Sequence, residues 1–307
     1  MKLSAIAAAS IAAVALFTAS CPGFAQSYPD RPIRLIVPYP PGGVDTQARA
    51  IVQKMGEMLG KPVFVENRAG ANGFIGTQLV ARAAPDGYTL LFATSSTLSV
   101  GPYLVRQAPF DALKDFTPIT FAYAGMATIA INSKVPVNSL QELIAYAKKN
   151  PGKLTYASSG IGSIFHLLGE GLKEAAGIDV LHVPYKGSGP AYVDLVAGRV
   201  DMGFPAIELI RIHWKAGKVK LLAVAEAARH PQLPDLPKVD EVVPGFEKPP
   251  SWIGMLAPSA VPKEIQARLT STALAALNSR EIRGRLEAGG YIVLACKPED
   301  CLATMKR

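Results

Sequence analysis

Short apolar runs alternate along the chain with longer amphipathic segments, in a repeated order of strand, loop and helix. The apolar runs predict strands at 33–37, 63–66, 89–93, 128–132, 154–158, 180–183, 200–204 and 220–225. The segments between them predict helices at 45–59, 74–83, 139–149, 163–176, 189–197 and 206–216. This alternation is typical of an α/β fold with largely parallel sheets.

Residues that favour helix ends support these boundaries. Asn138 or Ser139 can cap the start of the third predicted helix, and Asn150-Pro151-Gly152 can end it. Gly177 and Gly198 lie just after two other predicted helices, where a glycine readily takes the left-handed conformation of a C-cap.

Residues 1–25 have the features of a secretory signal peptide. Lys2 is followed by an apolar run over 5–19, and Gly23 and Ala25 offer small residues at the −3 and −1 positions of a cleavage site. That run is about 15 residues long, which is short of the roughly 20 that a membrane-spanning helix needs. A lipoprotein acylated on Cys21 is the alternative, but the residues before it suit such a site poorly. We therefore expect a soluble periplasmic protein.

Length and charge narrow the class of protein further. About 280 mature residues exceed what one hydrophobic core usually holds, so two domains are expected. The formal net charge is +8, of which Lys2 would leave with the signal peptide. Basic residues are scattered and do not alternate with aromatic ones, so no nucleic-acid partner is expected.

Two cysteines, Cys296 and Cys301, remain after cleavage at the predicted site. An exported protein meets an oxidising compartment, so a disulfide between them is possible, although spacing alone does not show that the geometry permits it. The chain has no CxxC motif and no Cys/His pattern with zinc spacing. No metal site is predicted.

The motifs of common enzymes and cofactor sites are missing from the sequence. Neither Gly160-Ile161-Gly162 nor Gly187-Ser188-Gly189 continues into a dinucleotide fingerprint, and there is no Walker A motif. His166 and Glu170 lie four residues apart, which favours a local hydrogen bond over a metal site. None of the four histidines lies in a hydrolase motif. We expect neither a cofactor nor catalysis.

Three loops after predicted strands share one chemistry. They are 40–43 (PPGG), 93–97 (ATSST) and 157–163 (ASSGIGS), and each is rich in small residues, hydroxyls and backbone N–H groups. The first leads into a helix that we expect to begin at Asp45, whose dipole would favour an anion. Ligands of open α/β sheets bind at the carboxyl ends of strands. The loops therefore predict a binding cleft between two domains.

Seven segments, in the same order along the chain, resemble the Bug/TctC family, the extracytoplasmic solute receptors of tripartite tricarboxylate transporters. The matching segments are 28–43 (YPDRPIRLIVPYPPGG), 65–70 (VENRAG), 83–91 (AAPDGYTLL), 151–160 (PGKLTYASSG), 182–187 (HVPYKG), 222–224 (LAV) and 252–258 (WIGMLAP). Together they extend over nearly the whole mature chain.

The resemblance implies a two-domain periplasmic binding protein fold of type II-like architecture, with a hinge of two crossing strands. Domain 1 would hold residues 26–125 and 251–307, and domain 2 residues 126–250. Such a receptor acts as a monomer, closes over a small carboxylate and delivers it to the permease subunits of a membrane transporter.

The resemblance also implies which residues line the cleft, with the first loop taking one carboxylate through backbone groups and ordered waters. From domain 1 they are Tyr39, Pro41, Gly42, Gly43, Asp45, Thr46, Ala93, Thr94 and Ser95. From domain 2 they are Ser158, Ser159, Gly160, Gly162, Ser163, Tyr185, Lys186, Gly187, Phe204, Pro205 and Ala206. N–H groups and hydroxyls suit a carboxylate because they donate charge-assisted hydrogen bonds.

The chain departs from the family pattern in two places. The first loop looks one residue shorter than in many relatives, which would shift the carboxylate site or widen the pocket. The last helix, which begins near Pro298, is expected to be shorter than in relatives and to leave apolar surface uncovered, with a disulfide in part compensating.

Two other functions stay open at this stage. One is a periplasmic protein that senses a ligand for a signalling partner, and the other is a secreted hydrolase that depends on Ser158 or Ser159. The residues do not identify the ligand.

Overall fold

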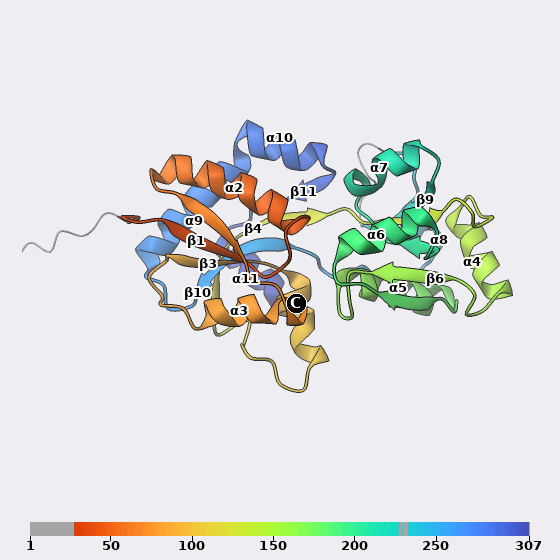
Figure 1. Ribbon diagram of the computed structural model, residues 1–307, viewed down its shortest axis with the longest axis horizontal. Helices are drawn as coiled ribbons and strands as arrows, with labels where there is room; N and C mark the ends of the chain where they lie inside the picture. The colour runs from red at the N-terminus through yellow and green to blue at the C-terminus, as the bar shows by residue number, and fades with distance from the viewer. Residues whose placement is uncertain (1–27, 227–228, 230–232, 307) are drawn as a thin grey trace, which may run out of the picture. The chain divides into compact units, whose positions relative to one another are not determined.

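Two mixed β-sheets with helices against them make up the described part of the chain (Figure 1). The computed structural model describes residues 28–226, 229 and 233–306. The predicted signal peptide and Cys21 lie outside these residues. Both sheets belong to one compact unit that begins at Arg31.

The first sheet has six strands in the order β11-β4-β10-β3-β1-β2. Strand β1 pairs in parallel with β2 and β3, whereas β10 runs antiparallel to β3 and β4, and β11 runs antiparallel to β4. The bounds are β1 Ile33–Val37, β2 Val63–Asn67, β3 Thr89–Thr94, β4 Phe116–Gly125, β10 Ile253–Pro258 and β11 Tyr291–Val293.

The second sheet has five strands in the order β7-β6-β8-β5-β9. Strand β6 pairs in parallel with β7 and β8, whereas β5 runs antiparallel to β8 and β9. The bounds are β5 Thr128–Asn132, β6 Thr155–Ser158, β7 Leu181–Pro184, β8 Met202–Gly203 and β9 Val219–Val224.

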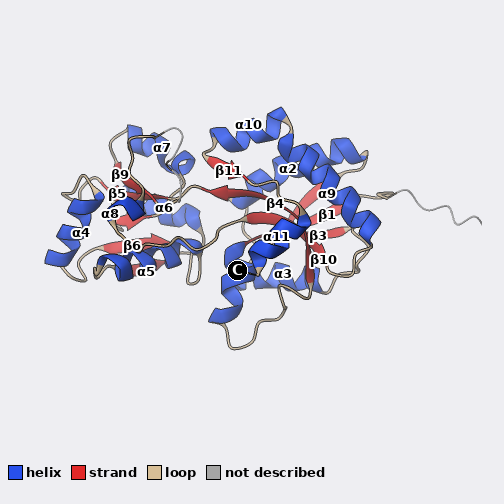
Figure 2. Cartoon of the chain, turned by 180° about the vertical axis from the view of Figure 1, so that it is seen from behind, coloured by secondary structure: helices blue, strands red, loops and turns tan. Residues whose placement is uncertain are grey.

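Each sheet has its own set of helices (Figure 2). With the first sheet are α2 Val44–Leu59, α3 Phe74–Ala81, α9 Lys263–Asn278, α10 Arg280–Ala288 and α11 Pro298–Met305. With the second are α4 Leu140–Lys149, α5 Ile164–Ala176, α6 Ser188–Ala197, α7 Ile207–Lys215 and α8 Val239–Val242. None of the helices in the described residues is long and apolar enough to cross a membrane.

The structure confirms the α/β class, and all the predicted strands and helices are present with small changes at their ends. Ser139 caps α4 by accepting from the Glu142 N–H, and Gly177 and Gly198 end α5 and α6 in left-handed conformation. The prediction of largely parallel sheets is wrong, because both sheets are mixed. The antiparallel pairs all involve strands next to a point where the chain passes from one sheet to the other. A local sequence pattern does not predict where the chain makes these passages.

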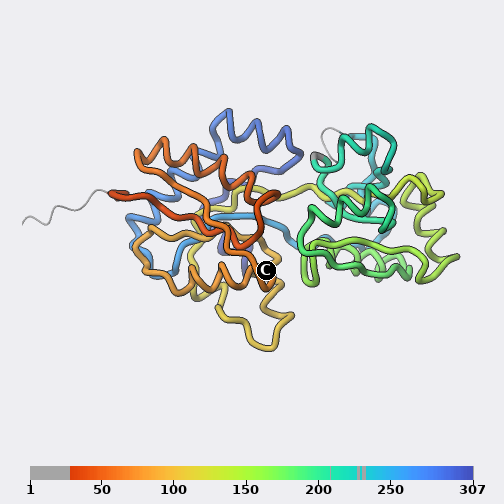
Figure 3. Tube along the Cα trace, in the orientation of Figure 1, coloured from red at the N-terminus to blue at the C-terminus, as the bar shows by residue number. Residues whose placement is uncertain are grey.

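The chain crosses between the sheets twice, first between β4 and β5 and again between β9 and β10 (Figure 3). The two crossings are bonded where the Ala225 N–H donates to the Ala127 carbonyl oxygen at 2.8 Å. The Glu226 carboxylate accepts from the Ala127 N–H at 3.0 Å and from the Lys248 ammonium at 2.6 Å. A largely buried ion pair therefore lies beside the crossings.

Helix α5 packs so closely on β6 that Gly169 leaves no room for a side chain. A Cβ there would lie 2.2 Å from the Tyr156 ring, whereas a Cβ on Gly171 in the same helix would meet only Phe246, at 3.9 Å. Tyr156 is fully buried and forms part of the second sheet's hydrophobic core. The ring cannot move aside without disturbing that core.

We expect Gly169→Ala to lower the free energy of unfolding by about 1–2 kcal/mol, because the cost of overpacking exceeds the gain in helix propensity. Gly171→Ala is the matched control and should raise it by up to about 1 kcal/mol. Urea denaturation of both variants measures the difference. Equal effects of the two substitutions would contradict the close packing of α5 on Tyr156.

A disulfide joins Cys296 and Cys301 near the end of the chain, with their Cα atoms 5.9 Å apart. Cys301 lies within helix α11, which contacts β4 and buries the side chains of Cys301 and Met305. The Thr120 hydroxyl on β4 donates to the Cys296 carbonyl oxygen at 2.8 Å. The C-terminal segment is thereby attached to a central strand of the first sheet.

Candidate functional site

The first loop turns at two glycines between β1 and α2. Gly42 and Gly43 have φ angles of 101° and 52°, which only glycine adopts without strain. Helix α2 begins at Val44, and Gly43 is its N-cap. The expectation that Asp45 starts the helix is therefore corrected, since Asp45 lies in its first turn.

Asp45 holds the loop in shape. Its carboxylate is buried and accepts from the Asn67 amide at 2.9 Å and from the Arg49 guanidinium at 3.0 Å. Burial alone would raise the pKa of Asp45, but the hydrogen bonds from Arg49 and Asn67 outweigh it and lower that pKa. The same Asn67 amide also donates to the Tyr39 carbonyl oxygen at 3.0 Å. We name Asp45, Arg49 and Asn67 the loop clamp.

Sequence reasoning missed Asn67 and Arg49 as residues that shape the site. The VENRAG segment could have indicated Asn67. This residue ends strand β2, so it lies at the same sheet edge as the first loop. Strands β1 and β2 are parallel, with Val37 opposite Asn67.

Tyr39 joins the first loop to the second. Its hydroxyl lies 2.6 Å from the Thr97 hydroxyl oxygen and 2.9 Å from that of Thr94, and it accepts from the Thr94 N–H at 3.2 Å. Burial raises the pKa of Tyr39. The Thr97 hydroxyl also contacts the Asn72 carbonyl oxygen at 3.0 Å. Most of this bonding is internal to the protein.

The other predicted residues of the first two loops divide by exposure. Ala93 and Ser95 are buried, and the Ser95 N–H donates to the Trp252 carbonyl oxygen at 2.9 Å. Residues 41–43 and Thr46 are exposed.

The third loop lies between β6 and α5. The Ser158 hydroxyl oxygen accepts from the Gly160 N–H at 3.1 Å and lies 2.7 Å from the Nε2 atom of His182. The Ser163 side chain caps α5 by accepting from the His166 N–H at 3.2 Å. Gly160 and Gly162 both have positive φ angles. The loop is tightly bonded to itself and to the imidazole behind it.

Two stacked imidazoles support this loop. The rings of His166 and His182 are 4.2 Å apart between centroids, and the Tyr156 ring stacks on His182 at 4.8 Å. The Nδ1 atom of His166 accepts from the Gly162 N–H at 3.1 Å. Burial lowers the pKa of both histidines, and together with the neighbouring His166 it brings that of His182 to about 4.

Glu170 does not form the local hydrogen bond with His166 that its spacing favoured. It accepts instead from the Tyr156 hydroxyl at 2.6 Å and from the Lys173 ammonium at 3.0 Å. Burial would raise the pKa of Glu170, but these two donors lower it overall. The carboxylate is thus held ionised beside the imidazole pair.

The remaining predicted residues lie behind or beside the third loop. The N–H groups of Tyr185 and Gly187 donate to the carbonyl oxygens of Ser158 and Ser159, at 3.0 and 3.1 Å. The Tyr185 hydroxyl donates to Asp194 at 2.7 Å, and burial with that bond raises the pKa of Tyr185 to about 12. Lys186 is exposed, whereas Phe204, Pro205 and Ala206 are buried.

Loops from the two sheets meet at one point. The Ile164 N–H, at the start of α5, donates to the Ser96 hydroxyl oxygen at 3.0 Å. Leu104 packs on Gly162, where an added Cβ would lie 1.9 Å from the Leu104 Cδ1 atom. Since Tyr39 contacts Thr94, all three predicted loops are connected. Many of their N–H groups and hydroxyls are bonded within the protein, but Gly42, Gly43 and Thr46 of the first loop are exposed, and N–H donors there suit an anion.

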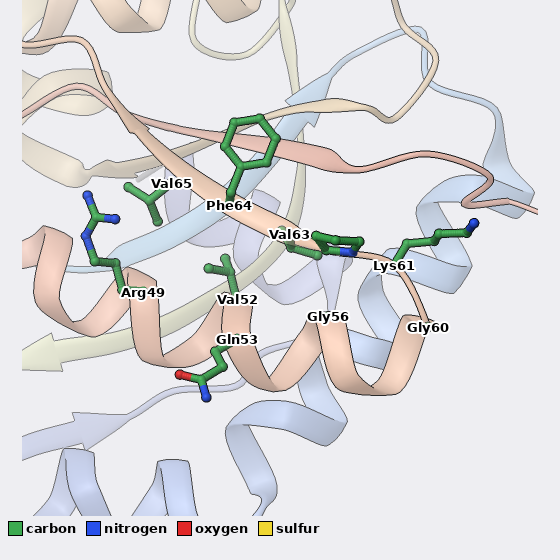
Figure 4. A pocket seen from close by; sticks show the side chains of 10 residues that line it. Arg49, Val52, Gln53, Gly56, Gly60, Lys61, Val63, Phe64 and Val65 are labelled. Carbon is green, nitrogen blue, oxygen red and sulfur yellow. The ribbon is translucent and has the colours of Figure 1, made fainter.

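Hollows elsewhere on the protein are separate from these loops. One of about 610 Å³ lies between α2 and β2 (Figure 4), and its lining contains Arg49 of the loop clamp but none of the predicted ligand residues. Another of about 770 Å³ is lined mainly by residues of α6, α7 and the segment after β5. Among the described residues, no cluster of three or more His, Cys, Asp or Glu side chains could hold a metal ion.

Two α/β sheets linked by two crossings, with anion-suited loops from both sheets in contact, define a solute-binding protein of the periplasmic type. The sequence profile of the tripartite tricarboxylate transporter family receptor, TctC, matches residues 47–303. The chain belongs to this family.

Solved structures agree with this assignment. The periplasmic binding protein BugD is 38% identical, with 91% of this chain and 94% of that one covered and a TM-score of 0.82. Rpa4515 of R. palustris with adipate is 33% identical over 91% and 94% of the two chains, at a TM-score of 0.85. MatC from Rhodopseudomonas palustris with bound malate is 31% identical, with 91% of this chain and 96% of that one covered and a TM-score of 0.81.

Proposed function

We propose that this protein is a periplasmic receptor that captures a small carboxylate and delivers it to the permease of a tripartite tricarboxylate-type transporter. The observation that carries this proposal is the contact between loops of the two sheets, marked by the bond between Ser96 and Ile164. The adipate and malate bound to two similar proteins indicate the chemical class of the ligand.

We place the ligand between two lobes, formed by residues 26–125 with 251–307 and by residues 126–250. The first lobe would bind one carboxylate through the N–H groups of residues 42–44 and Thr46, and the second lobe would bind the ligand through loop 158–163. Contacts that exist only when both lobes touch the ligand stabilise a closed state. The bonded crossings near Ala127 and Ala225 would act as the hinge.

The protein would act without turnover. Ser158 and His182 have the spacing of a nucleophile and its base, but the Ser158 side chain is buried and also bonded to both backbone groups of Gly160. Its role is to shape the loop. A hydrolase would need this hydroxyl to reach a substrate.

A thermal-shift screen of the protein, unfolded and refolded to remove any bound ligand, tests the proposal against small carboxylates. At a hundredfold excess over Kd a ligand contributes about 2.7 kcal/mol, which for a chain of this size raises Tm by roughly 4–5 °C. Calorimetric titration should confirm each hit. A folded protein that shifts with no carboxylate would contradict the proposal.

Gly43→Asp should weaken carboxylate binding by at least about fivefold relative to Gly43→Asn. Both substitutions strain the backbone equally at a φ of 52°, but only aspartate adds a negative charge, and like charges a few ångströms apart repel by about 1–4 kcal/mol. Titration calorimetry on both variants isolates the charge. Equal affinities would show that the ligand does not approach the first loop.

A further inference from the structure

Each imidazole of the pair forms a hydrogen bond with one group of the third loop, His166 with the Gly162 N–H and His182 with the Ser158 hydroxyl. A neutral imidazole has one N–H and one acceptor nitrogen. Because His166 Nδ1 accepts from the Gly162 N–H, the proton of neutral His166 is on Nε2. The Gly162 N–H, which belongs to the predicted carboxylate site, is therefore bonded to the imidazole and not free to bind a ligand.

Protonation would reverse this arrangement. An imidazolium carries N–H groups on both nitrogens, so a proton on Nδ1 of His166 would face the Gly162 N–H and release it. The Ser158 hydroxyl donates its proton to the Gly160 carbonyl oxygen, so neutral His182 already donates from Nε2 to the Ser158 oxygen at 2.7 Å. A second proton on His182 would therefore go to Nδ1. Each change adds a positive charge behind the loop, and each favours an anion in front of it.

We propose, on the basis of the function proposed above, that His166 and His182 are positioning residues through which binding of an anionic ligand is coupled to uptake of a proton. Their rings lie 4.2 Å apart, and two like charges at that distance disfavour each other. The pair therefore takes up one proton and not two.

Neighbouring groups determine the pH at which the two histidines take up a proton. Glu170, on the same helix as His166, favours the charged form, whereas burial and Lys173 oppose it. The Tyr156 hydroxyl from β6 is committed to Glu170. From the first sheet's side the contacts to this loop come from Ser96 and Leu104, which do not titrate. The pair is neutral at pH 7 without ligand, and a bound anion raises its affinity for protons.

The sign of the pH dependence follows from this linkage. Burial lowers the pKa of both histidines in the free protein. Since the ligand-bound state holds the proton more tightly, affinity should rise as the pH falls from about 7 to 5.5, by at most about tenfold per pH unit. The carboxyl groups of adipate and malate stay largely ionised over that range, since an ordinary carboxyl has a pKa near 4.

Titration calorimetry with adipate and malate near pH 6.5, in buffers of different ionisation enthalpy, measures the number of protons taken up. We expect a net uptake of up to one proton per ligand. The double variant His166→Asn, His182→Gln keeps an acceptor oxygen near the Gly162 N–H and an amide N–H donor near the Ser158 oxygen without titrating, and it should bind with no uptake and a flat pH profile. His213→Asn, on α7 away from the loop, should keep the wild-type uptake.

Binding to the wild type without proton uptake overturns this inference and leaves the proposed function standing. Wild-type uptake in the double variant overturns it too, because the proton would then reside elsewhere. If neither probe nor any other carboxylate binds, both proposals fail. If the double variant does not fold, the two single variants test the inference instead. Each is expected to take up less than the wild type, and wild-type uptake in both would overturn the inference.

Discussion

Replacing Lys248 by alanine is expected to lower the free energy of unfolding by about 3–5 kcal/mol, the usual cost of removing one partner of a buried ion pair. The side chains of Lys248 and Glu226 are only 14% and 8% exposed. Burial already raises the pKa of Glu226, and Lys248 is the main group that opposes this. Without it the carboxylate is left buried with the Ala127 N–H as its remaining partner.

Urea denaturation of Lys248→Ala against the wild type measures the effect. The pKa of Glu226 in the folded variant would lie above its unfolded value, so the variant's stability should fall as the pH rises from near 4.5 towards 7. Lys238→Ala is the control, because its pair with Asp240 is more exposed and should contribute at most about 1 kcal/mol. Similar losses of stability in the two variants would show that the Lys248–Glu226 pair contributes no more than an exposed ion pair.

Replacing Asn67 by alanine is expected to weaken carboxylate binding by about 10- to 100-fold. The Asn67 amide donates to both the Tyr39 carbonyl oxygen and Asp45, and a hydrogen bond to a charged group contributes about 1.5–3 kcal/mol. Without it the first loop loses the geometry that directs its N–H groups at a ligand. Titration calorimetry with the carboxylate found in the screen measures the change.

Arg68→Ala is the matched control for this substitution. Arg68 is the next residue along the chain, is exposed, and pairs with Glu66 rather than with the first loop. We expect its affinity to match the wild type. A folded Asn67→Ala variant that binds as tightly as Arg68→Ala would show that the loop clamp is not needed for binding.

The elements that could be predicted are those whose signal is local. Strand β1 and helix α2 were evident because an apolar run, two glycines and an amphipathic segment follow one another directly. Strand β4 was missed, since Pro118 interrupts its apolar run and its two neighbours, β10 and β11, lie more than a hundred residues away. The direction of a strand in its sheet likewise depends on where the chain passes from one sheet to the other, and this cannot be predicted from a short segment of sequence.

The candidate site shows the same division. The three loops could be found because each follows the end of a strand. The roles of Asp45, Tyr39 and Ser158 could not, because their partners Asn67, Thr94 and His182 lie between 22 and 55 residues away in sequence. Polar residues at strand ends were read as ligand contacts, whereas several of these side chains hold the loops. Which of them a ligand touches stays a prediction.

The position of β10 has a consequence for how the chain folds as it is made. In the first sheet β10 lies between β3 and β4, so these strands cannot be joined before residues 253–258 have been synthesised. All strands of the second sheet lie between Thr128 and Val224. A chain that emerges from its N-terminus can therefore complete the inner segment first, while β1 to β4 wait with unpaired edges, the state in which chaperones protect a nascent protein from aggregation.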